Sequence, residues 1–216
     1  MCAWWAAISG FAPVGKRAED VFTGIIQAIG RVRKVTPVHG GVRMTVDAGA
    51  LPLADVKIGD SIAIDGACLT VVALAGQELE FDMSQETLSC TAGLAAGAAV
   101  NLEKALRLAD RIDGHLVAGH VDGVGTVVRF DAAGDNRRLV IDTPRELARY
   151  IARKGSVAVN GVSLTVNAVH GTQFEVNLIP HTLAATTFYA LAAGMQVNIE
   201  VDTLARYVER ILGASE

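Results

Sequence analysis

Three types of side chain in this sequence can do chemistry, and they lie in short stretches. Cys68 and Ser163 each begin a triplet that continues with Leu and Thr. A thiol can act as a nucleophile, and a hydroxyl can hydrogen-bond a polar ligand. His120, in the stretch GHVDG, can carry a proton. Each also has an ordinary structural interpretation, because a free Cys is commonly a small buried hydrophobe and a lone His is commonly structural.

The same residue types give no sign of a metal site. His115 and His120 are five residues apart, which is not the spacing of two zinc ligands on one helical face. Cys2, Cys68 and Cys90 are far apart, odd in number and without a CxxC pair. We therefore expect no metal, no disulfide framework, and reduced thiols in a cytoplasmic protein.

The elements that position these residues occur twice. The block SIAIDGACLTV at 61–71 returns as SVAVNGVSLTV at 156–166, an offset of 95 residues. The same offset aligns 22–32 with 117–127 and 79–88 with 174–183, and a fourth pair, 97–103 with 194–200, is offset by 97. Blocks that keep their spacing indicate an internal duplication.

Each half predicts a small β-barrel. Its β-branched segments are short, and the pairs Asp65-Gly66 and Asn160-Gly161 are typical of hairpin turns, because Gly tolerates positive φ. Many short strands per half favour closed antiparallel barrels, since closure removes exposed sheet edges. A duplicated barrel offers two similar pockets, which suit two copies of one ligand.

Helical periodicity is weak except in three segments, Leu102–Leu108, Pro144–Ile151 and Thr203–Leu212. A Pro suits the first turn of the second segment. The third segment is amphipathic, with four apolar residues on one face: Leu204, Val208, Ile211 and Leu212. Asp202 precedes it and is expected to cap its N-terminus.

The composition excludes several classes of protein. Apolar residues make up 51% of the 216, which is typical of an ordered globular chain. A net charge of -4 and an aromatic content of 5% argue against a binder of single-stranded nucleic acid, which needs basic grooves and aromatic platforms. The apolar run in residues 1–20 is too short to span a membrane, and no positive charge precedes it as in a secretory signal. We expect a soluble protein with neither nucleic acid nor membrane as a partner.

Five stretches resemble riboflavin synthase and occur in that family's order: FTGII at 22–26, GDSIAIDGACLTV at 59–71, GHLVAGHVDG at 114–123, KGSVAVNGVSLTV at 154–166 and NLIPHTL at 177–183. The likeness, which begins near Val21, is more specific than any single short motif. It implies an all-β fold of two homologous six-stranded antiparallel Greek-key barrels, at 21–113 and 114–201, and a C-terminal oligomerisation helix at 202–216. It also implies a homotrimer, with a ligand site between the N-terminal barrel of one subunit and the C-terminal barrel of the next.

The chain departs from the family at its start. Family members begin at Met-Phe-Thr-Gly, whereas here Val21 holds the Met position and twenty residues precede it. Because a valine can reflect a GTG start codon, we hypothesise that 1–20 is a tail outside the native protein. An intact mass that includes 1–20 would refute this.

The resemblance implies a transferase that performs the last step of riboflavin biosynthesis. Two molecules of 6,7-dimethyl-8-ribityllumazine per site exchange a four-carbon unit, giving riboflavin and 5-amino-6-(D-ribitylamino)uracil. A proton leaves the C7 methyl group of one ring, and a nucleophile or water adds transiently at C7. No cofactor is expected, because the lumazine ring is itself the electron sink. We further expect association with lumazine synthase.

The resemblance also assigns site residues. Catalytic roles fall on Cys68, His120, Ser61, Ser163 and Asp202. Substrate-binding roles fall on Phe22, Thr23, Gly24, Ile25, Ile26, Cys68, Leu69, Thr70, Asp82, Met83, Ser84, Gln85, Glu86, Thr87, Gly119, His120, Val121, Lys154, Ser163, Leu164, Thr165, Asn177, Leu178, Ile179, Pro180, His181 and Thr182. The stretches 82–87 and 177–182 are expected to be loop-like strand ends.

The two halves differ at several of these positions. The repeat places Cys68 opposite Ser163, Ile25 opposite His120, Thr23 opposite Ala118, Glu86 opposite His181, and Gly59 opposite Lys154. Such differences can assign donor and acceptor roles to two otherwise similar pockets.

The main alternative is a non-catalytic lumazine or flavin carrier with the same double barrel. Both halves keep the Cys/Ser-Leu-Thr triplet, which favours the enzyme.

Overall fold

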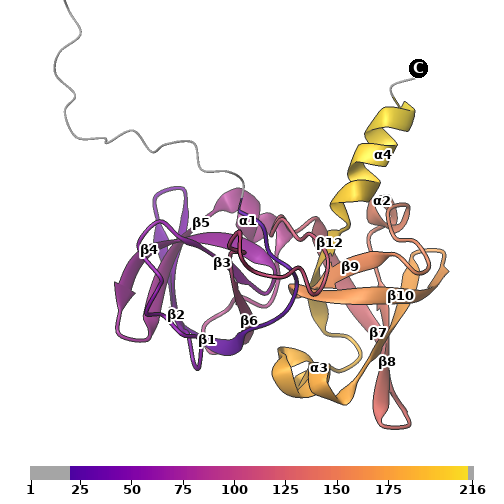
Figure 1. Ribbon diagram of the computed structural model, residues 1–216, viewed down its shortest axis with the longest axis horizontal. Helices are drawn as coiled ribbons and strands as arrows, with labels where there is room; N and C mark the ends of the chain where they lie inside the picture. The colour runs from indigo at the N-terminus through magenta and orange to yellow at the C-terminus, as the bar shows by residue number, and fades with distance from the viewer. Residues whose placement is uncertain (1–19, 214–216) are drawn as a thin grey trace, which may run out of the picture.

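The computed structural model describes residues 20–213, which form two closed antiparallel barrels of six strands each (Figure 1). The first barrel contains β1 (Ala28–Val38), β2 (Gly41–Asp47), β3 (Ser61–Ile64), β4 (Ala67–Ala75), β5 (Glu78–Ser84) and β6 (Ala99–Lys104). The second contains β7 (Gly123–Ala133), β8 (Asn136–Asp142), β9 (Ser156–Val159), β10 (Val162–His170), β11 (Gln173–Leu178) and β12 (Gln196–Val201). Both close in one order, β1-β2-β5-β4-β3-β6 and β7-β8-β11-β10-β9-β12, which confirms the predicted pair of barrels.

Each barrel has its own core, because alternate side chains of its strands point inward. In β5 the burial alternates along the strand, and Leu79 and Phe81 are fully buried. In β11 Phe174 and Val176 take the same places in the second core. The repeated sequence blocks thus fill equivalent positions.

The helices are α1 (Gln85–Cys90), α2 (Arg145–Ala148), α3 (Pro180–Ala185), the 3₁₀ turn η1 (Thr187–Ala190) and α4 (Thr203–Gly213). The predictions of helices within 144–151 and 203–212 are confirmed. The predicted helix at 102–108 is wrong, because Leu102 lies in β6, where four consecutive residues are buried. A strand covered on both faces loses its alternation and can be mistaken for a helix.

The stretches 82–87 and 177–182 are not loop-like, since each runs from a strand into a one-turn helix. Ser84 caps α1 by accepting a hydrogen bond from Thr87 N, and Pro180 lies in the first turn of α3. Helices of six residues are too short to show a helical period in the sequence.

The two predicted hairpin turns meet between the barrels. Asp65 and Asn160 have φ of 45° and 44°, and the glycines that follow also have positive φ, which confirms the turn type. A Cβ on Gly66 would lie 2.8 Å from Gly161 N, so the two backbones approach too closely for any other residue.

Two asparagines connect these turns. Asp65 Oδ1 accepts from Asn101 N at 2.7 Å, and Asn160 Oδ1 accepts from Asn198 N at 2.7 Å. The Asn101 side chain donates to Asn160 O, and the Asn198 side chain donates to Asp65 O, each at 3.0 Å. The contacts are reciprocal, so they join the halves through an approximate two-fold symmetry.

Two non-strand segments also join the halves, and we call residues 20–27 and 114–122 the first and second crossing segments. They pair with each other where Phe22 N donates to Val117 O at 2.7 Å. Ser163 N of the second barrel donates to Gly24 O, and Cys68 N of the first barrel donates to Gly119 O, both at 2.8 Å. Each segment therefore reaches the barrel of the other half.

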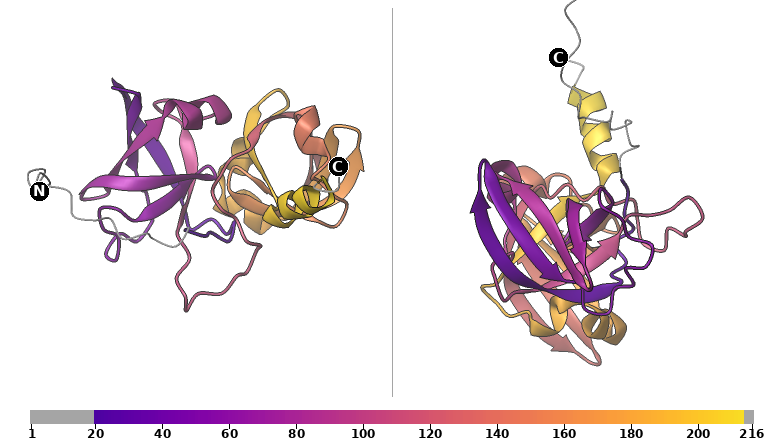
Figure 2. Two further views of the ribbon diagram at one scale, coloured as in Figure 1. Left: turned by 90° about the horizontal axis from the view of Figure 1, so that it is seen from above. Right: turned by 90° about the vertical axis from the view of Figure 1, so that its left-hand side faces the viewer.

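Helix α4 projects away from the second barrel (Figures 1 and 2). Leu204, Val208, Ile211 and Leu212 are 56–72% exposed, so the apolar face does not pack on its own barrel. The opposite face forms ion pairs with the end of α2, through Arg149–Glu209, and with the second crossing segment, through Arg206–Asp122. Among the described residues, no helix has the length and hydrophobicity to cross a membrane.

The predicted tail at 1–20 lies outside the described residues except for Asp20. The predicted boundary between residues 113 and 114 falls in the connection from β6 to β7, just before the second crossing segment.

Candidate functional site

A pocket of about 210 Å³ opens where the second crossing segment meets the first barrel. Its lining comes from β4 (Ala67, Cys68), from α1 and its C-terminal cap (Glu86, Thr87, Cys90, Thr91), and from the crossing segment (Gly119, His120, Val121). We call it the Cys68 pocket. It brings six of the predicted site residues together, and the Cys68 and His120 it joins are 52 positions apart in the chain.

Cys90, Thr91 and Ala67 were missed by the sequence analysis. Cys90 Sγ lies 3.8 Å from Glu86 Oε1, one helical turn away in α1. Recognition of Ser84 as a helix cap would have placed Cys90 on the same helical face as Glu86.

Glu200 in β12 holds the second crossing segment in place. Its carboxylate is buried and accepts hydrogen bonds from Ala118 N at 2.7 Å and Gly119 N at 3.0 Å. Burial raises the pKa of Glu200 to about 7, and the nearby Asp122 adds to the rise. Gly119 has φ 76°, and a Cβ there would lie 2.6 Å from Cys68 Cβ. The backbone of the second crossing segment thus packs directly against Cys68 at Gly119, and the next residue, His120, lines the same pocket as Cys68.

The second barrel has the equivalent arrangement, built on the first crossing segment. Glu103 in β6 accepts from Thr23 N and Thr23 Oγ1, both at 2.7 Å, and from Gly24 N at 2.9 Å. Burial raises the pKa of Glu103, and these hydrogen bonds oppose the rise. A Cβ on Gly24, where φ is 75°, would lie 2.6 Å from Ser163 Cβ. Ser163 therefore lies under Gly24 as Cys68 lies under Gly119.

His115 was considered in the sequence only as a metal ligand, yet its Nδ1 lies 2.7 Å from Ser163 Oγ. Burial lowers the pKa of His115, and the negative charge of Asp202 opposes this. Asp202 also caps α4, as predicted, because its Oδ1 accepts from Leu204 N at 3.0 Å. The signal that could have found His115 is its place in the stretch GHLVAGH, beside His120.

The Cys68 thiol is partly buried, and burial is the main reason that its pKa is raised. The charges of Asp20 and Glu200 raise this pKa further, whereas hydrogen bonding with Ser61 lowers it. At neutral pH Cys68 is therefore a protonated thiol. In this form it can make polar contacts, whereas the nucleophile is the thiolate.

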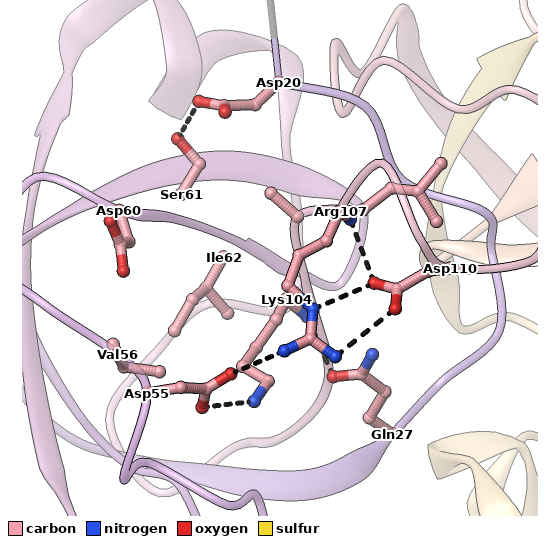
Figure 3. Close-up of a pocket in the computed structure, with 12 residues that line it drawn as sticks. Asp20, Gln27, Asp55, Val56, Asp60, Ser61, Ile62, Lys104, Arg107 and Asp110 are labelled. Carbon is pink, nitrogen blue, oxygen red and sulfur yellow. Dashed lines mark hydrogen bonds and ion pairs between the residues drawn. The ribbon is translucent and has the colours of Figure 1, made fainter.

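Ser61 lines a different pocket, of about 240 Å³, beside β3 and β6 (Figure 3). Its Oγ donates to Asp20 Oδ2 at 2.6 Å. Across the pocket, Arg107 pairs with Asp110 at 3.2 Å and Lys104 pairs with Asp55 at 2.7 Å. The five predicted catalytic residues thus fall into two groups within one chain: Cys68, His120 and Ser61 at the first barrel, Ser163 and Asp202 at the second.

The remaining predicted binding residues have varied surroundings. Phe22, Leu69, Met83, Leu164 and Leu178 are buried hydrophobic residues whose side chains pack in the interior. Thr70, Thr165, Asn177, Ile179, Pro180, His181, Ser84, Gln85 and Ile25 are exposed. Asp82 is exposed too, and its carboxylate is held by Arg43 at 2.7 and 2.8 Å, which lowers the pKa of Asp82. Thr182 is half-buried at α3, and Ile26 is half-buried against the second barrel's core.

Lys154 stands where the first half has Gly59. Both residues have positive φ, 67° and 92°, and both donate a backbone hydrogen bond to the second strand that follows, Lys154 to Val166 O in β10 and Gly59 to Val71 O in β4. Lys154 therefore holds a strained left-handed conformation that glycine adopts freely. Within residues 20–213, no group of three or more His, Cys, Asp or Glu side chains is placed to hold a metal ion.

The fold and these paired sites define a protein with two lumazine-binding domains, since the family described as "Lumazine binding domain" matches residues 23–105 and 118–202. Riboflavin synthase from Photobacterium phosphoreum is 48% identical over 194 residues, covering 89% of both chains, and that from Brucella abortus is 44% identical, covering 88% of this chain and 98% of its own. The chain belongs to the riboflavin synthase family and is accordingly a transferase of the riboflavin pathway.

Solved structures with the same fold include two complexes of LumP. The complex with riboflavin has a TM-score of 0.75 and 27% identity, covering 84% of this chain and all of its own. The complex with 6,7-dimethyl-8-(1'-D-ribityl) lumazine has a TM-score of 0.74 and 26% identity, covering 84% and 99%. Both are described as complexes with a lumazine or a flavin.

Proposed function

We propose that the chain converts two molecules of 6,7-dimethyl-8-ribityllumazine into riboflavin and 5-amino-6-(D-ribitylamino)uracil. One observation carries this proposal: each barrel presents a thiol or hydroxyl at the same repeat position, under a crossing segment supplied by the other half. Two equivalent sites suit two identical substrates. A reaction between identical molecules also needs unequal roles, and Cys68 opposite Ser163 provides a difference.

The chain's own groups act mainly by positioning. The Cys68 pocket takes one ring, with the neutral Cys68 thiol near C7 and His120 as the proton carrier. The hydroxyls of Thr70 and Thr165, on the outer faces of their barrels, bind the pyrimidine edge or the ribityl chain. Holding two reactants in one geometry contributes up to roughly 7–11 kcal/mol, so modest acid–base help suffices.

The active assembly in this proposal is a homotrimer. The catalytic groups at Cys68 and at Ser163 are separate within one chain, so a complete site combines the first barrel of one subunit with the second barrel of its neighbour. The exposed apolar face of α4 supports an intersubunit role for this helix.

The two free thiols in the described residues, Cys68 and Cys90, support a cytoplasmic location. Association with lumazine synthase belongs to the same proposal.

The test is a direct assay. Purified protein is incubated with 6,7-dimethyl-8-ribityllumazine, and riboflavin is followed by its absorbance. We expect riboflavin from the parent and at least about tenfold less from Cys68→Ser and His120→Gln, the size of effect typical of a lost acid–base or positioning group. His170→Gln is the matched control, because His170 is an exposed histidine at the end of β10 and lines neither the Cys68 pocket nor the pocket beside Ser61. Equal activity in all the variants would remove Cys68 and His120 from the mechanism.

A lumazine carrier is the second candidate, and the likeness to LumP favours it. Tight fluorescent binding of the lumazine without riboflavin formation would support the carrier over the enzyme.

A further inference from the structure

The end of the second crossing segment is attached to the second barrel by Asp122. Its N donates to Ile199 O at 2.8 Å, and its Oδ2 accepts from Val201 N at 2.8 Å. The residue at the equivalent position of the first crossing segment is Gln27, which makes the same two bonds to β6, at 2.9 and 3.1 Å. A neutral amide therefore suffices for this attachment.

The carboxylate of Asp122 has a further partner, the guanidinium of Arg206. Arg206 lies in α4, which follows β12 after a single residue (Figure 1). The Asp122 side chain is 8% exposed and that of Arg206 is 43% exposed, so the cation reaches a buried anion from the surface. In the first half, β6 continues into the non-helical residues 105–113, so this ion pair distinguishes the second half from the first.

Arg206 acts on two buried carboxylates rather than one. Burial is the main cause that raises the pKa of Glu200, the charge of Asp122 adds to the rise, and the charge of Arg206 opposes it. Burial also raises the pKa of Asp122, whereas the hydrogen bond from Val201 N and the charges of Arg206 and His120 lower it. The two carboxylates thus repel each other, and Arg206 offsets this repulsion.

We propose that Arg206 of α4 is a positioning residue for His120. Its charge neutralises the two carboxylates that hold the second crossing segment, and this segment carries His120 into the Cys68 pocket. Helix α4 therefore supports the Cys68 pocket, whereas the site at Ser163 depends on the first crossing segment. The inference rests on the proposed function only for the role of His120 as the proton carrier.

Amide hydrogen exchange in the full chain, followed by mass spectrometry, tests this support. In Arg206→Gln we expect the amides of residues 118–122 to exchange at least about tenfold faster, because removal of one partner of a buried ion pair leaves an uncompensated charge. Peptides that cover residues 23–27 are the internal reference and should keep the parent rate. Arg149→Gln is the matched control, since it removes another ion pair of α4, one that leads to α2.

Two further variants test whether the charge is the cause. Arg206→Lys keeps the positive charge and should keep the parent rate of exchange. Asp122→Gln installs the side chain that the first half uses at this position and removes one of the two negative charges. We therefore expect the exchange of residues 118–122 to return close to the parent rate when Asp122→Gln is combined with Arg206→Gln.

Riboflavin formation separates the positioning of His120 from a general loss of structure. Arg206→Gln should lower kcat about tenfold, with a smaller change in KM, as is typical of a displaced acid–base group. It should add nothing to the loss in His120→Gln, because both changes act through one group. The exchange measurement needs no substrate, so a chain that makes no riboflavin would refute the proposed function and leave the role of Arg206 to be decided by exchange.

Four results would each overturn the proposal. The first is unchanged exchange of residues 118–122 in Arg206→Gln, and the second is an equal increase in Arg149→Gln. The third is a double variant, Asp122→Gln with Arg206→Gln, that exchanges as fast as Arg206→Gln alone. The fourth is a loss of turnover in Arg206→Gln that adds in full to the loss in His120→Gln.

Discussion

Asp65 and Asn160 occupy symmetry-related turns and differ in one functional group, a carboxyl in Asp65 and an amide in Asn160. They accept equivalent hydrogen bonds. Asp65 is 4% exposed, and burial raises its pKa to about 7, against the hydrogen bond from Asn101 N. The junction of the two halves therefore contains a group that ionises near neutral pH.

This predicts a pH-dependent effect of Asp65→Asn. The folded-state pKa is above the ordinary value of 3.8, so the folded chain keeps a proton that the unfolded chain loses between these values. The stability that Asp65 contributes falls as pH rises through this window and is lost above about 7. Asn cannot ionise, so we expect the free energy of unfolding to rise by a few kcal/mol at pH 8 and much less at pH 5, measured by urea titration.

Asn160→Asp is the mirror-image control, because it places a second carboxyl in the equivalent turn. It should destabilise the chain more at pH 8 than at pH 5. If Asp65→Asn changed the free energy of unfolding equally at both pH values, Asp65 would not be a buried group that ionises in this range.

At the scale of elements, the sequence predicted what is local and missed what is long-range. The repeat and the Asp-Gly and Asn-Gly turns predicted two barrels, because hairpins form between neighbours in the chain. The strand β6 was mistaken for a helix, since burial on both faces removes its alternation. The approach of His120 to Cys68 across the junction leaves no local pattern, so only the family resemblance placed both in one site.

Glu200 links elements of the two halves. It lies in β12 of the second barrel and positions the second crossing segment, which lines the pocket of the first barrel. In Glu200→Gln one of the two acceptor oxygens becomes a donor that faces a backbone N–H. We expect a loss of about 1–3 kcal/mol in stability by urea unfolding. We also expect weaker binding of the lumazine by fluorescence titration, as Gly119 and His120 lose their support.

Glu103→Gln is the comparison, since it loosens the first crossing segment and so the site at Ser163. Bound lumazine should shield Cys68 from an alkylating reagent. We expect this protection to fall in Glu200→Gln and to persist in Glu103→Gln. The reverse pattern would show that the segments do not serve the opposite barrels.

At the scale of the whole molecule, α4 carries a group of exposed apolar side chains that have no partner within the described residues. Leu204, Tyr207, Val208, Ile211 and Leu212 are all more than half exposed. A helix of 11 residues with such a face is marginal alone and is stabilised by packing against another surface. The proposed trimer supplies that packing.

Ile211→Glu is expected to shift the protein from trimer toward monomer in sedimentation velocity, because it places a charge in the apolar face. Activity should fall in parallel, since the proposed site combines residues of two chains. Arg210→Glu adds negative charge to the same turn outside that face and should leave the sedimentation coefficient unchanged. A parent protein that sediments as a monomer would refute the role given to α4.

The exchange of segments between the barrels has a consequence for how the duplicated halves can diverge. A copy of a gene segment is usually free to drift while its twin preserves the original role. Here Gly119 must stay small for the sake of Cys68, and Gly24 for the sake of Ser163. Neither half alone encodes its complete site, so a mutation in one crossing segment acts on the site of the other half. The two halves are thus bound to evolve as one unit, even where their side chains have become different.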